Sequence, residues 1–134
     1  MPWYIDTSAF MKLVVAEEHS ATMRSWADLE ESRAGALWSS DLLRTEALRA
    51  ARRISPEALR VTRDRLDRTS FISVTTDTFE RAGELDPDVL RSLDAMHLAA
   101  ALSLGPDLDG IVTYDDRMTA AAQTLGLATT APRG

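Results

Sequence analysis

The chain of 134 residues contains no cysteine, two histidines and, among its 15 basic residues, a single lysine, Lys12. The absence of cysteine excludes disulfides, thiolate nucleophiles and zinc or iron–sulfur sites built on cysteine. No apolar run approaches the roughly 20 residues that a membrane span requires. A strand-like segment, Trp3-Tyr4-Ile5, begins almost at once and leaves no room for a basic and apolar leader. We therefore expect a cytoplasmic protein with no membrane association.

The overall composition is that of an ordinary globular protein. Hydrophobic residues make up 45% of the chain and charged residues 27%, which argues against disorder and low complexity. Domains usually contain about 100–150 residues. We therefore expect one domain over residues 1–134, with enough buried surface for its own core.

Charge is unevenly distributed along the chain. The formal net charge of −6 argues against a general coat for nucleic acid, whose phosphates it would repel. Residues 44–68 nevertheless carry eight arginines and four acidic residues, a net charge of +4, and the remainder carries −10. Ion pairs along two solvated helices, such as Glu46 with Arg49 and Glu57 with Arg60, would explain this segment. An arginine face on an otherwise acidic protein is the alternative.

Short apolar segments alternate with helical patterns along the whole chain. Five segments predict strands, at residues 3–5, 36–38, 71–74, 111–113 and 127–129. Helices are predicted between them, including one capped by Thr7 or Ser8, one that ends at Gly35 and one that begins at Ser55-Pro56. This alternation predicts an α/β fold with a parallel sheet covered by helices on both faces. Residues 131–134 are expected to form a loose tail.

Acidic residues stand where a parallel sheet would form a site, beyond the carboxyl ends of its strands. Asp6 follows the first strand and Asp115 and Asp116 follow the fourth, while neighbouring helices carry Glu46 and Asp94. Glu46 lies close to the apolar stripe of its helix, so its carboxylate needs a partner, a proton or a metal. A cap, the helix dipole or a turn would explain each aspartate alone. Together the acids indicate a shared pocket.

A pocket of carboxylates predicts a metal-dependent chemistry. Several carboxylates in one pocket repel one another, so such a pocket usually holds a cation or a proton. Ligand sets made only of oxygen select hard cations such as Mg²⁺ or Mn²⁺. These ions lower the pKa of a bound water and stabilise the leaving oxygen of a phosphodiester. This chemistry needs no lysine, cysteine or histidine, in agreement with the composition.

Four segments that carry these acids follow one another in a fixed order. They are Tyr4-Ile5-Asp6-Thr7-Ser8-Ala9-Phe10, Glu46 on the helix after the second strand, Leu93-Asp94-Ala95-Met96-His97-Leu98-Ala99, and Val112-Thr113-Tyr114-Asp115. In order and spacing they resemble the motifs of PIN-domain ribonucleases, and most closely those of the VapC toxins of type II toxin–antitoxin systems. The resemblance runs from Tyr4 to about Ala128 and covers nearly the whole chain. It implies a divalent-metal-dependent endoribonuclease.

The resemblance also implies which residues form the site and what the protein binds. The catalytic residues and ligands of Mg²⁺ or Mn²⁺ would be Asp6, Glu46, Asp94 and Asp115. The supporting residues would be Thr7, Ser8, Thr113 and Asp116. The arginines expected to hold the RNA backbone are Arg49, Arg52, Arg53 and Arg60. The family further implies a three-layer fold with a parallel sheet of order 3-2-1-4-5, a homodimer, and a VapB-like antitoxin that blocks the site.

Three other interpretations of the same residues stay open. Phosphoryl transfer through an aspartate would need a lysine late in the chain, and the only lysine is Lys12. A non-catalytic PIN-like binding module would use the acidic pocket to hold an arginine of a partner. A histidine-based ribonuclease would be indifferent to chelators and would leave a cyclic phosphate. His97 lies three residues after Asp94 on the same helix face, where it could assist the site or serve packing.

Overall fold

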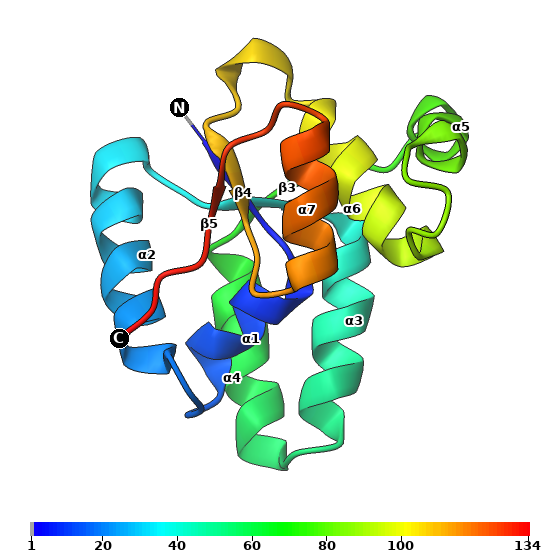
Figure 1. The fold of residues 1–134 in the computed structure, drawn as a ribbon. Coiled ribbons are helices and arrows are strands. Elements are labelled where there is room, and N and C mark those ends of the chain that lie inside the picture. The colour runs from blue at the N-terminus through cyan, green and yellow to red at the C-terminus, as the bar shows by residue number, and fades with distance from the viewer. Residues whose placement is uncertain (1) are drawn as a thin grey trace.

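The fold is built on a parallel sheet of five short strands (Figure 1). The computed structural model describes residues 2–134. The strands are β1 (Trp3–Ile5), β2 (Trp38–Ser40), β3 (Ser70–Ile72), β4 (Gly110–Val112) and β5 (Thr129–Thr130). Their order across the sheet is β3-β2-β1-β4-β5, and all neighbouring strands run parallel. The α/β class and the strand order implied by the family resemblance are confirmed.

Helices connect the strands and cover both faces of the sheet. Within the described residues the α-helices are α1 (Thr7–Val14), α2 (Ser20–Ala34), α3 (Asp41–Arg52), α4 (Pro56–Asp67), α5 (Thr76–Glu84), α6 (Ser92–Leu102) and α7 (Asp116–Thr124). Figure 1 shows α2 on one side of the sheet and α7 with α6 on the other. No helix among residues 2–134 is both long and apolar enough to cross a membrane.

The two faces of the sheet bury separate apolar clusters. Ile5 and Val112 are paired in register and belong to the cluster formed with α1, α2 and α3. Tyr4 and Ile111 are the preceding pair and belong to the cluster formed with α6 and α7. Successive residues of a strand point to opposite faces of the sheet, so two consecutive residues of β1 or β4 supply one side chain to each cluster. The expected three-layer arrangement follows from this alternation.

A glycine lets β4 lie close to β5. A Cβ atom at Gly110 would lie 2.4 Å from the carbonyl oxygen of Ala128 and 2.6 Å from the ring of Trp3. Only a residue without a side chain fits this position. The close approach fixes β4 beside β1, where the Asp6 amide donates to the carbonyl of Val112 at 3.1 Å. The ends of β1 and β4 therefore place Asp6 and Thr113 next to each other.

Strand boundaries differ from those expected from the sequence. The strands expected at residues 36–38, 71–74, 111–113 and 127–129 lie at 38–40, 70–72, 110–112 and 129–130. A strand of two or three residues is defined by its hydrogen bonds to neighbouring strands, and local composition does not show which residues make them. Trp38, for example, lies opposite both Tyr4 and Ser70.

Two local expectations are also corrected. Of the residues considered as the cap of α1, the structure has Asp6 in that role, and Thr7 and Ser8 lie inside the helix. The segment 131–134 is not loose, because the Tyr114 hydroxyl donates to the carbonyl of Pro132 and the Gly134 amide donates to His19 Nδ1. Asp6 at the end of β1 and Tyr114 after β4 make two of these contacts, and His19 before α2 makes the third.

Candidate active site

Asp6 lies at the carboxyl end of β1 and is 3% exposed. Its Oδ1 accepts hydrogen bonds from the Ala9 amide (3.0 Å) and Ser8 Oγ (2.7 Å), and its Oδ2 accepts one from Thr113 Oγ1. Burial raises the pKa of Asp6, although these hydrogen bonds act in the opposite direction. Two of the supporting residues expected from the sequence, Ser8 and Thr113, thus contact Asp6 directly. Thr113 Oγ1 also accepts from the Asp115 amide at 3.1 Å, so Asp6 is linked to the loop that carries Asp115.

Glu46, in the middle of α3, contacts a buried histidine. Its Oε1 lies 2.6 Å from His97 Nε2 and accepts a hydrogen bond of 2.8 Å from Thr7 Oγ1, the third expected supporting residue. Burial acts to raise the pKa of Glu46, but the contacts with His97 and Thr7 outweigh it, so the pKa lies below its ordinary value. Among residues 2–134 these are the partners of Glu46, in place of the ion pair with Arg49 that helix spacing suggested.

The contact continues from Glu46 into the core. His97 is 2% exposed, and its Nδ1 lies 2.7 Å from Oη of Tyr4, which is fully buried. Tyr4 Oη donates in turn to Ser40 Oγ at the end of β2, at 2.9 Å. Glu46, His97, Tyr4 and Ser40 therefore form one continuous chain of polar contacts. The sequence indicated His97 as a neighbour of the site but gave no signal for Tyr4, which is 93 positions away.

Asp94 and Asp115 face an open part of the site. Asp115 is the N-cap of α7, where its Oδ1 accepts from the amides of Arg117 (2.8 Å) and Met118 (3.1 Å). Asp94 lies in the first turn of α6, and its carboxylate has no hydrogen bond or ion pair within the described residues. Partial burial and then repulsion by Asp115 raise the pKa of Asp94. The two carboxylates therefore lie within electrostatic range of each other.

A cavity of about 320 Å³, here named the acidic hollow, lies beside these two aspartates. It is lined by Arg91, Asp94, Asp115, Asp116 and Arg117. Asp116, expected as a neighbour of the metal site, is the exposed first residue of α7. The two arginines were not expected from the sequence. The available signal was their spacing, since Arg91 stands three residues before Asp94 and Arg117 two residues after Asp115.

The donor set fits a hard divalent cation. Asp94 has both carboxylate oxygens free of hydrogen bonds within residues 2–134, and Glu46 and Asp115 each use one oxygen in the contacts described above. Over that same range, no three His, Cys, Asp or Glu side chains form a preassembled metal-binding cluster. Mg²⁺ retains several waters and is typically bound through only one or two carboxylates. An all-oxygen site with few direct ligands agrees with that behaviour.

The arginines of residues 44–68 divide into two groups. Acidic partners are found for Arg44 (Asp41), Arg60 (Glu57 and Asp64) and Arg65 (Glu31). Arg60, one of the four expected RNA-binding residues, is thus held at 2.6 Å by Glu57 and at 3.0 Å by Asp64. This pair is the one that helix spacing predicted. Arg53, a second of the four, is the exposed C-terminal cap residue of α3.

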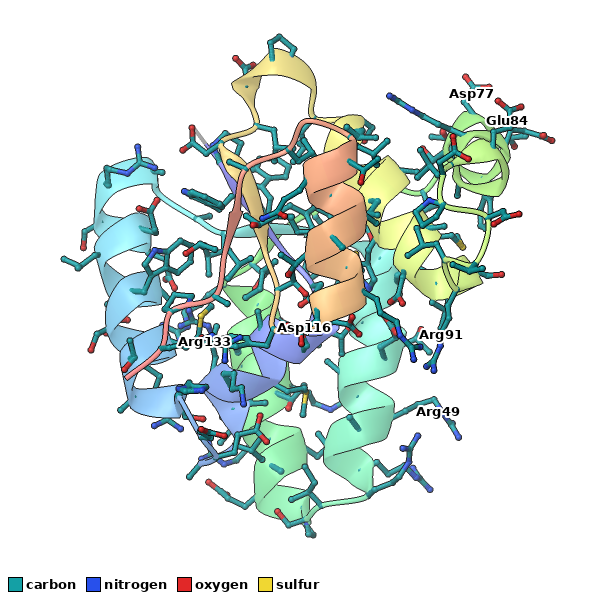
Figure 2. The ribbon with its side chains drawn as sticks, in the orientation of Figure 1. Arg49, Asp77, Glu84, Arg91, Asp116 and Arg133 are labelled. Atoms are coloured by element: carbon teal, nitrogen blue, oxygen red, sulfur yellow. The ribbon has the colours of Figure 1, made fainter. Side chains whose placement is uncertain are left out.

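The other two expected arginines lie together between α3 and α4. A cavity of about 180 Å³, here named the arginine groove, is lined by Leu48, Arg49, Arg52, Leu59 and Arg63. Within residues 2–134 none of these three arginines forms an ion pair. Figure 2 shows Arg49 on α3 and Arg91 before α6 projecting from the same side of the molecule. Arg63 was not singled out from the sequence, because only the packing of α4 against α3 brings it to Arg49.

Comparisons with known proteins identify the family of this chain. Residues 3–123 match the PIN domain family. Ribonuclease VapC46 of Mycobacterium tuberculosis is 41% identical to this chain over 129 residues. The chain belongs to the VapC family of PIN-domain ribonucleases. Ribonuclease VapC35 of the same organism is 39% identical over 135 residues, and both alignments cover 96% of each chain. The family resemblance inferred from the motifs is confirmed.

Solved structures of other family members share the fold. The crystal structure of VapC20 of Mycobacterium tuberculosis, described as a sarcin–ricin loop cleaving toxin, matches with a TM-score of 0.73 and 19% identity, over 98% of this chain and 100% of that one. VapBC2 of Rickettsia felis, solved bound to a DNA fragment from its promoter, matches with a TM-score of 0.72 and 13% identity, over 98% and 99%. At these identities the likeness concerns the architecture alone.

Proposed function

We propose that this VapC-family protein is an endoribonuclease toxin that hydrolyses RNA phosphodiesters at the carboxyl edge of its sheet. One observation carries the proposal: acids from four separate segments, Asp6, Glu46, Asp94 and Asp115, are linked at this edge by hydrogen bonds or by mutual electrostatic interaction. The ribonuclease names of the curated relatives support the reaction class. These four residues are proposed as the catalytic residues.

Asp94 and Asp115 are proposed to hold Mg²⁺ or Mn²⁺, with Glu46 contributing its free oxygen. The bound ion would supply charge stabilisation at the phosphodiester and lower the pKa of a water. The raised pKa of Asp94 supports this role, because repulsion by Asp115 is what a cation would relieve. Asp6, which is buried and accepts hydrogen bonds from Ala9, Ser8 and Thr113, is proposed as a further ligand of the ion. Through Thr113 it also orients the loop that carries Asp115.

The remaining polar groups bind and orient the substrate. Glu46 has a lowered pKa and stays ionised, so it can accept a hydrogen bond from the attacking water. Arg91 and Arg117 line the acidic hollow, and their guanidinium groups have no hydrogen bond or ion pair within the described residues. Guanidinium groups bind phosphate oxygens through paired hydrogen bonds. They are proposed to hold the phosphates beside the acids.

The proposal includes partners of the toxin. A VapB-like antitoxin is proposed from the family resemblance, and the similar structure of VapBC2 of Rickettsia felis, bound to a DNA fragment from its promoter, supports it. A homodimer is proposed from the family resemblance, and a cytoplasmic location is proposed with it. A non-catalytic module whose acidic pocket binds a partner's arginine is the alternative, and cleavage assays separate the two.

The test is cleavage of total cellular RNA by purified protein, with the new 5′ ends mapped by sequencing. Reactions contain Mg²⁺, Mn²⁺ or excess EDTA, and Asp94→Asn protein serves as the inactive variant. We expect cleavage with either ion, 5′-phosphate ends, and no cleavage with EDTA or the variant. Cleavage in EDTA with cyclic phosphate ends would point to a histidine-based ribonuclease. Absence of cleavage by the wild type under all conditions would support the non-catalytic module.

A further inference from the structure

Arg91, Asp94 and Arg117 line two cavities at once. One is the acidic hollow, and the other is a cavity of about 220 Å³ beside it, here named the apolar hollow. The residues that line only the apolar hollow are Pro87, Val89, Leu90, Ala120, Ala121 and Thr124. The same two arginines therefore stand between a carboxylate-lined space and a predominantly apolar one.

The apolar hollow exists because one face of α7 is built from small residues. Arg117, Ala120, Ala121 and Thr124 follow the spacing of three and four residues that places side chains on one helix face. The opposite wall is the segment 87–91, where Val89 is 84% exposed. Longer side chains on α7 would fill the space between these walls. The alanines leave an open apolar surface directly beside the site.

We propose that the apolar hollow receives one nucleobase of the RNA substrate, next to the phosphate that Arg91 and Arg117 bind. The proposal rests on the ribonuclease function proposed above. A nucleotide has a planar base with apolar faces next to an anionic phosphate. The apolar hollow would take the base, and Arg91 and Arg117 at its border with the acidic hollow would bind the phosphate. Sequence-dependent recognition of RNA generally uses unstacked bases that lie on aromatic side chains or on guanidinium planes. The apolar hollow offers the guanidinium groups of Arg91 and Arg117 beside its apolar walls. The base subsite would thus be a determinant of where the RNA is cut.

Size and charge favour a base over a protein segment. The volume of about 220 Å³ is below the roughly 300–1,000 Å³ of sites for drug-sized ligands, so it suits a single ring system. A two-fold axis passing through the hollow would bring Arg91 and Arg117 of a second copy of this chain close to the same two arginines of the first, so like charges would face each other. An RNA strand brings phosphates instead, which unpaired arginines complement.

The experiment combines two independent changes: protein variants that fill the apolar hollow, and RNA substrates that lack a single base. Ala120 is exposed on α7 and lies outside the acid cluster, so Ala120→Trp occupies the hollow without entering the core. Ala21→Trp, at an exposed position of α2 across the sheet, is the matched control, and Thr124→Trp is a second variant that fills the same hollow. Substrates are RNA oligonucleotides centred on a mapped cleavage site, each with one abasic nucleotide at a different position.

We expect one abasic position to lower kcat/KM of the wild type by about five-fold or more, the lower end of the range for one stacked base, because the apolar hollow has no aromatic side chain. Ala120→Trp should lower kcat/KM on intact RNA similarly and show no further loss at that abasic position, while Ala21→Trp behaves like the wild type. The proposal would be overturned if both hollow-filling variants still lost as much kcat/KM at that abasic position as the wild type does. It would also be overturned if an active wild type cleaved all the abasic substrates equally well.

A protein contact gives a different result. If Ala120→Trp and Thr124→Trp change the mass of the assembly in light scattering but leave cleavage unchanged, the hollow is an interface between chains and the base subsite is wrong. Mn²⁺ binding to the acidic hollow should be equal in all variants. A wild type that cleaves no RNA in Mg²⁺ or Mn²⁺ would overturn the nuclease and the subsite together, which distinguishes that outcome from failure of the subsite alone.

Discussion

His97 Nε2 lies 2.6 Å from Glu46 Oε1, and this contact joins a histidine that is 2% exposed to a glutamate that is partly exposed at the site. On its other side the imidazole contacts Tyr4 Oη at 2.7 Å, so both ring nitrogens have fixed partners. The ring cannot turn without losing one of them. One oxygen of Glu46 is therefore held in place, and the other stays available to the site. This relationship makes His97 a positioning residue for Glu46.

Two conservative replacements of His97 separate its contacts. The amide nitrogen of Gln can reach the place of Nε2 and bind Glu46, whereas that of Asn can reach only the place of Nδ1 and Tyr4. We expect His97→Gln to keep kcat within a few-fold of the wild type. His97→Asn should lower kcat or metal affinity by about 10–100-fold, the usual cost of losing a group that orients a metal ligand.

A purely structural role of His97 predicts a different pattern. Asn is one methylene shorter than Gln and leaves more space in the core, so His97→Asn should lower the melting temperature further than His97→Gln. Values of kcat measured well below both melting temperatures separate this loss of stability from a loss of positioning. In a Glu46→Gln background, His97→Asn should add no further loss, because the residue that it positions is already altered. Equal kcat values for His97→Gln and His97→Asn would contradict the positioning role.

Asp94→Asn should stabilise the metal-free protein at neutral pH. The pKa of Asp94 is raised in the folded state, so folded protein binds more protons than the unfolded chain between the ordinary Asp value of about 3.9 and the folded value. Its contribution to stability therefore decreases as pH rises through that window. Replacement removes the repulsion and should raise the free energy of unfolding by less than about 1 kcal/mol, because the group is partly exposed.

The measurement is urea unfolding in EDTA from pH 4 to 8, with the difference between the two proteins plotted against pH. Glu46, whose pKa is lowered, contributes with the opposite sign but cancels in this difference. Asp77→Asn is the matched control, since Asp77 is an exposed acid in the first turn of α5. It should lose favourable helix-dipole interaction and be slightly destabilised. Stabilisation by both substitutions would mean that general acidic charge, not the Asp115 contact, is responsible.

Divalent metal should stabilise the wild type through the same residues. A ligand that binds only the folded state at 100 times its Kd contributes about 2.7 kcal/mol. We therefore expect Mn²⁺ to raise the melting temperature of the wild type and of Asp77→Asn by several degrees, and to have little effect on Asp94→Asn. Differential scanning calorimetry across a Mn²⁺ series measures this without any cleavage assay. Equal shifts in all three proteins would place the metal elsewhere.

Sequence patterns predicted the parts of the fold that local chemistry decides. The alternation of strands and helices indicated the parallel sheet. Ser55-Pro56 correctly marked the start of α4, and Gly35 correctly marked the end of α2. The acids were found because parallel strands collect their carboxyl ends at one edge. The strand order came from the family resemblance, because periodicity does not determine which strands are neighbours.

Contacts between distant segments could not be predicted in this way. Tyr4 and His97 meet only because β1 and α6 pack together, and nothing in either segment signals the other. Arg91 precedes α6 and Arg117 lies in the first turn of α7, so their shared position depends on how α6 and α7 are placed. The exact ends of two- and three-residue strands likewise depend on neighbouring strands, as Trp38 in β2 shows.

The arginine groove gives a test of RNA binding that separates paired from unpaired arginines. Arg49, Arg52 and Arg63 line one groove without ion pairs among residues 2–134, whereas Arg60 is bound by Glu57 and Asp64. An arginine already paired with two acids adds little positive potential for phosphate. We therefore expect replacement of the three groove arginines by glutamine to weaken RNA binding strongly, and Arg60→Gln to have little effect.

Salt dependence makes this expectation quantitative. Each phosphate contact contributes about −0.7 to the slope of log K against log salt concentration for a single strand. Binding of a fluorescent RNA is measured in EDTA, where metal-dependent cleavage is suppressed. The slope should lose up to three such contributions in the triple variant and close to none in Arg60→Gln. Arg53→Gln, at the exposed end of α3, tests whether the path of the strand extends beyond the groove. An unchanged slope in the triple variant would mean that the RNA follows another surface and that these arginines serve a protein partner instead.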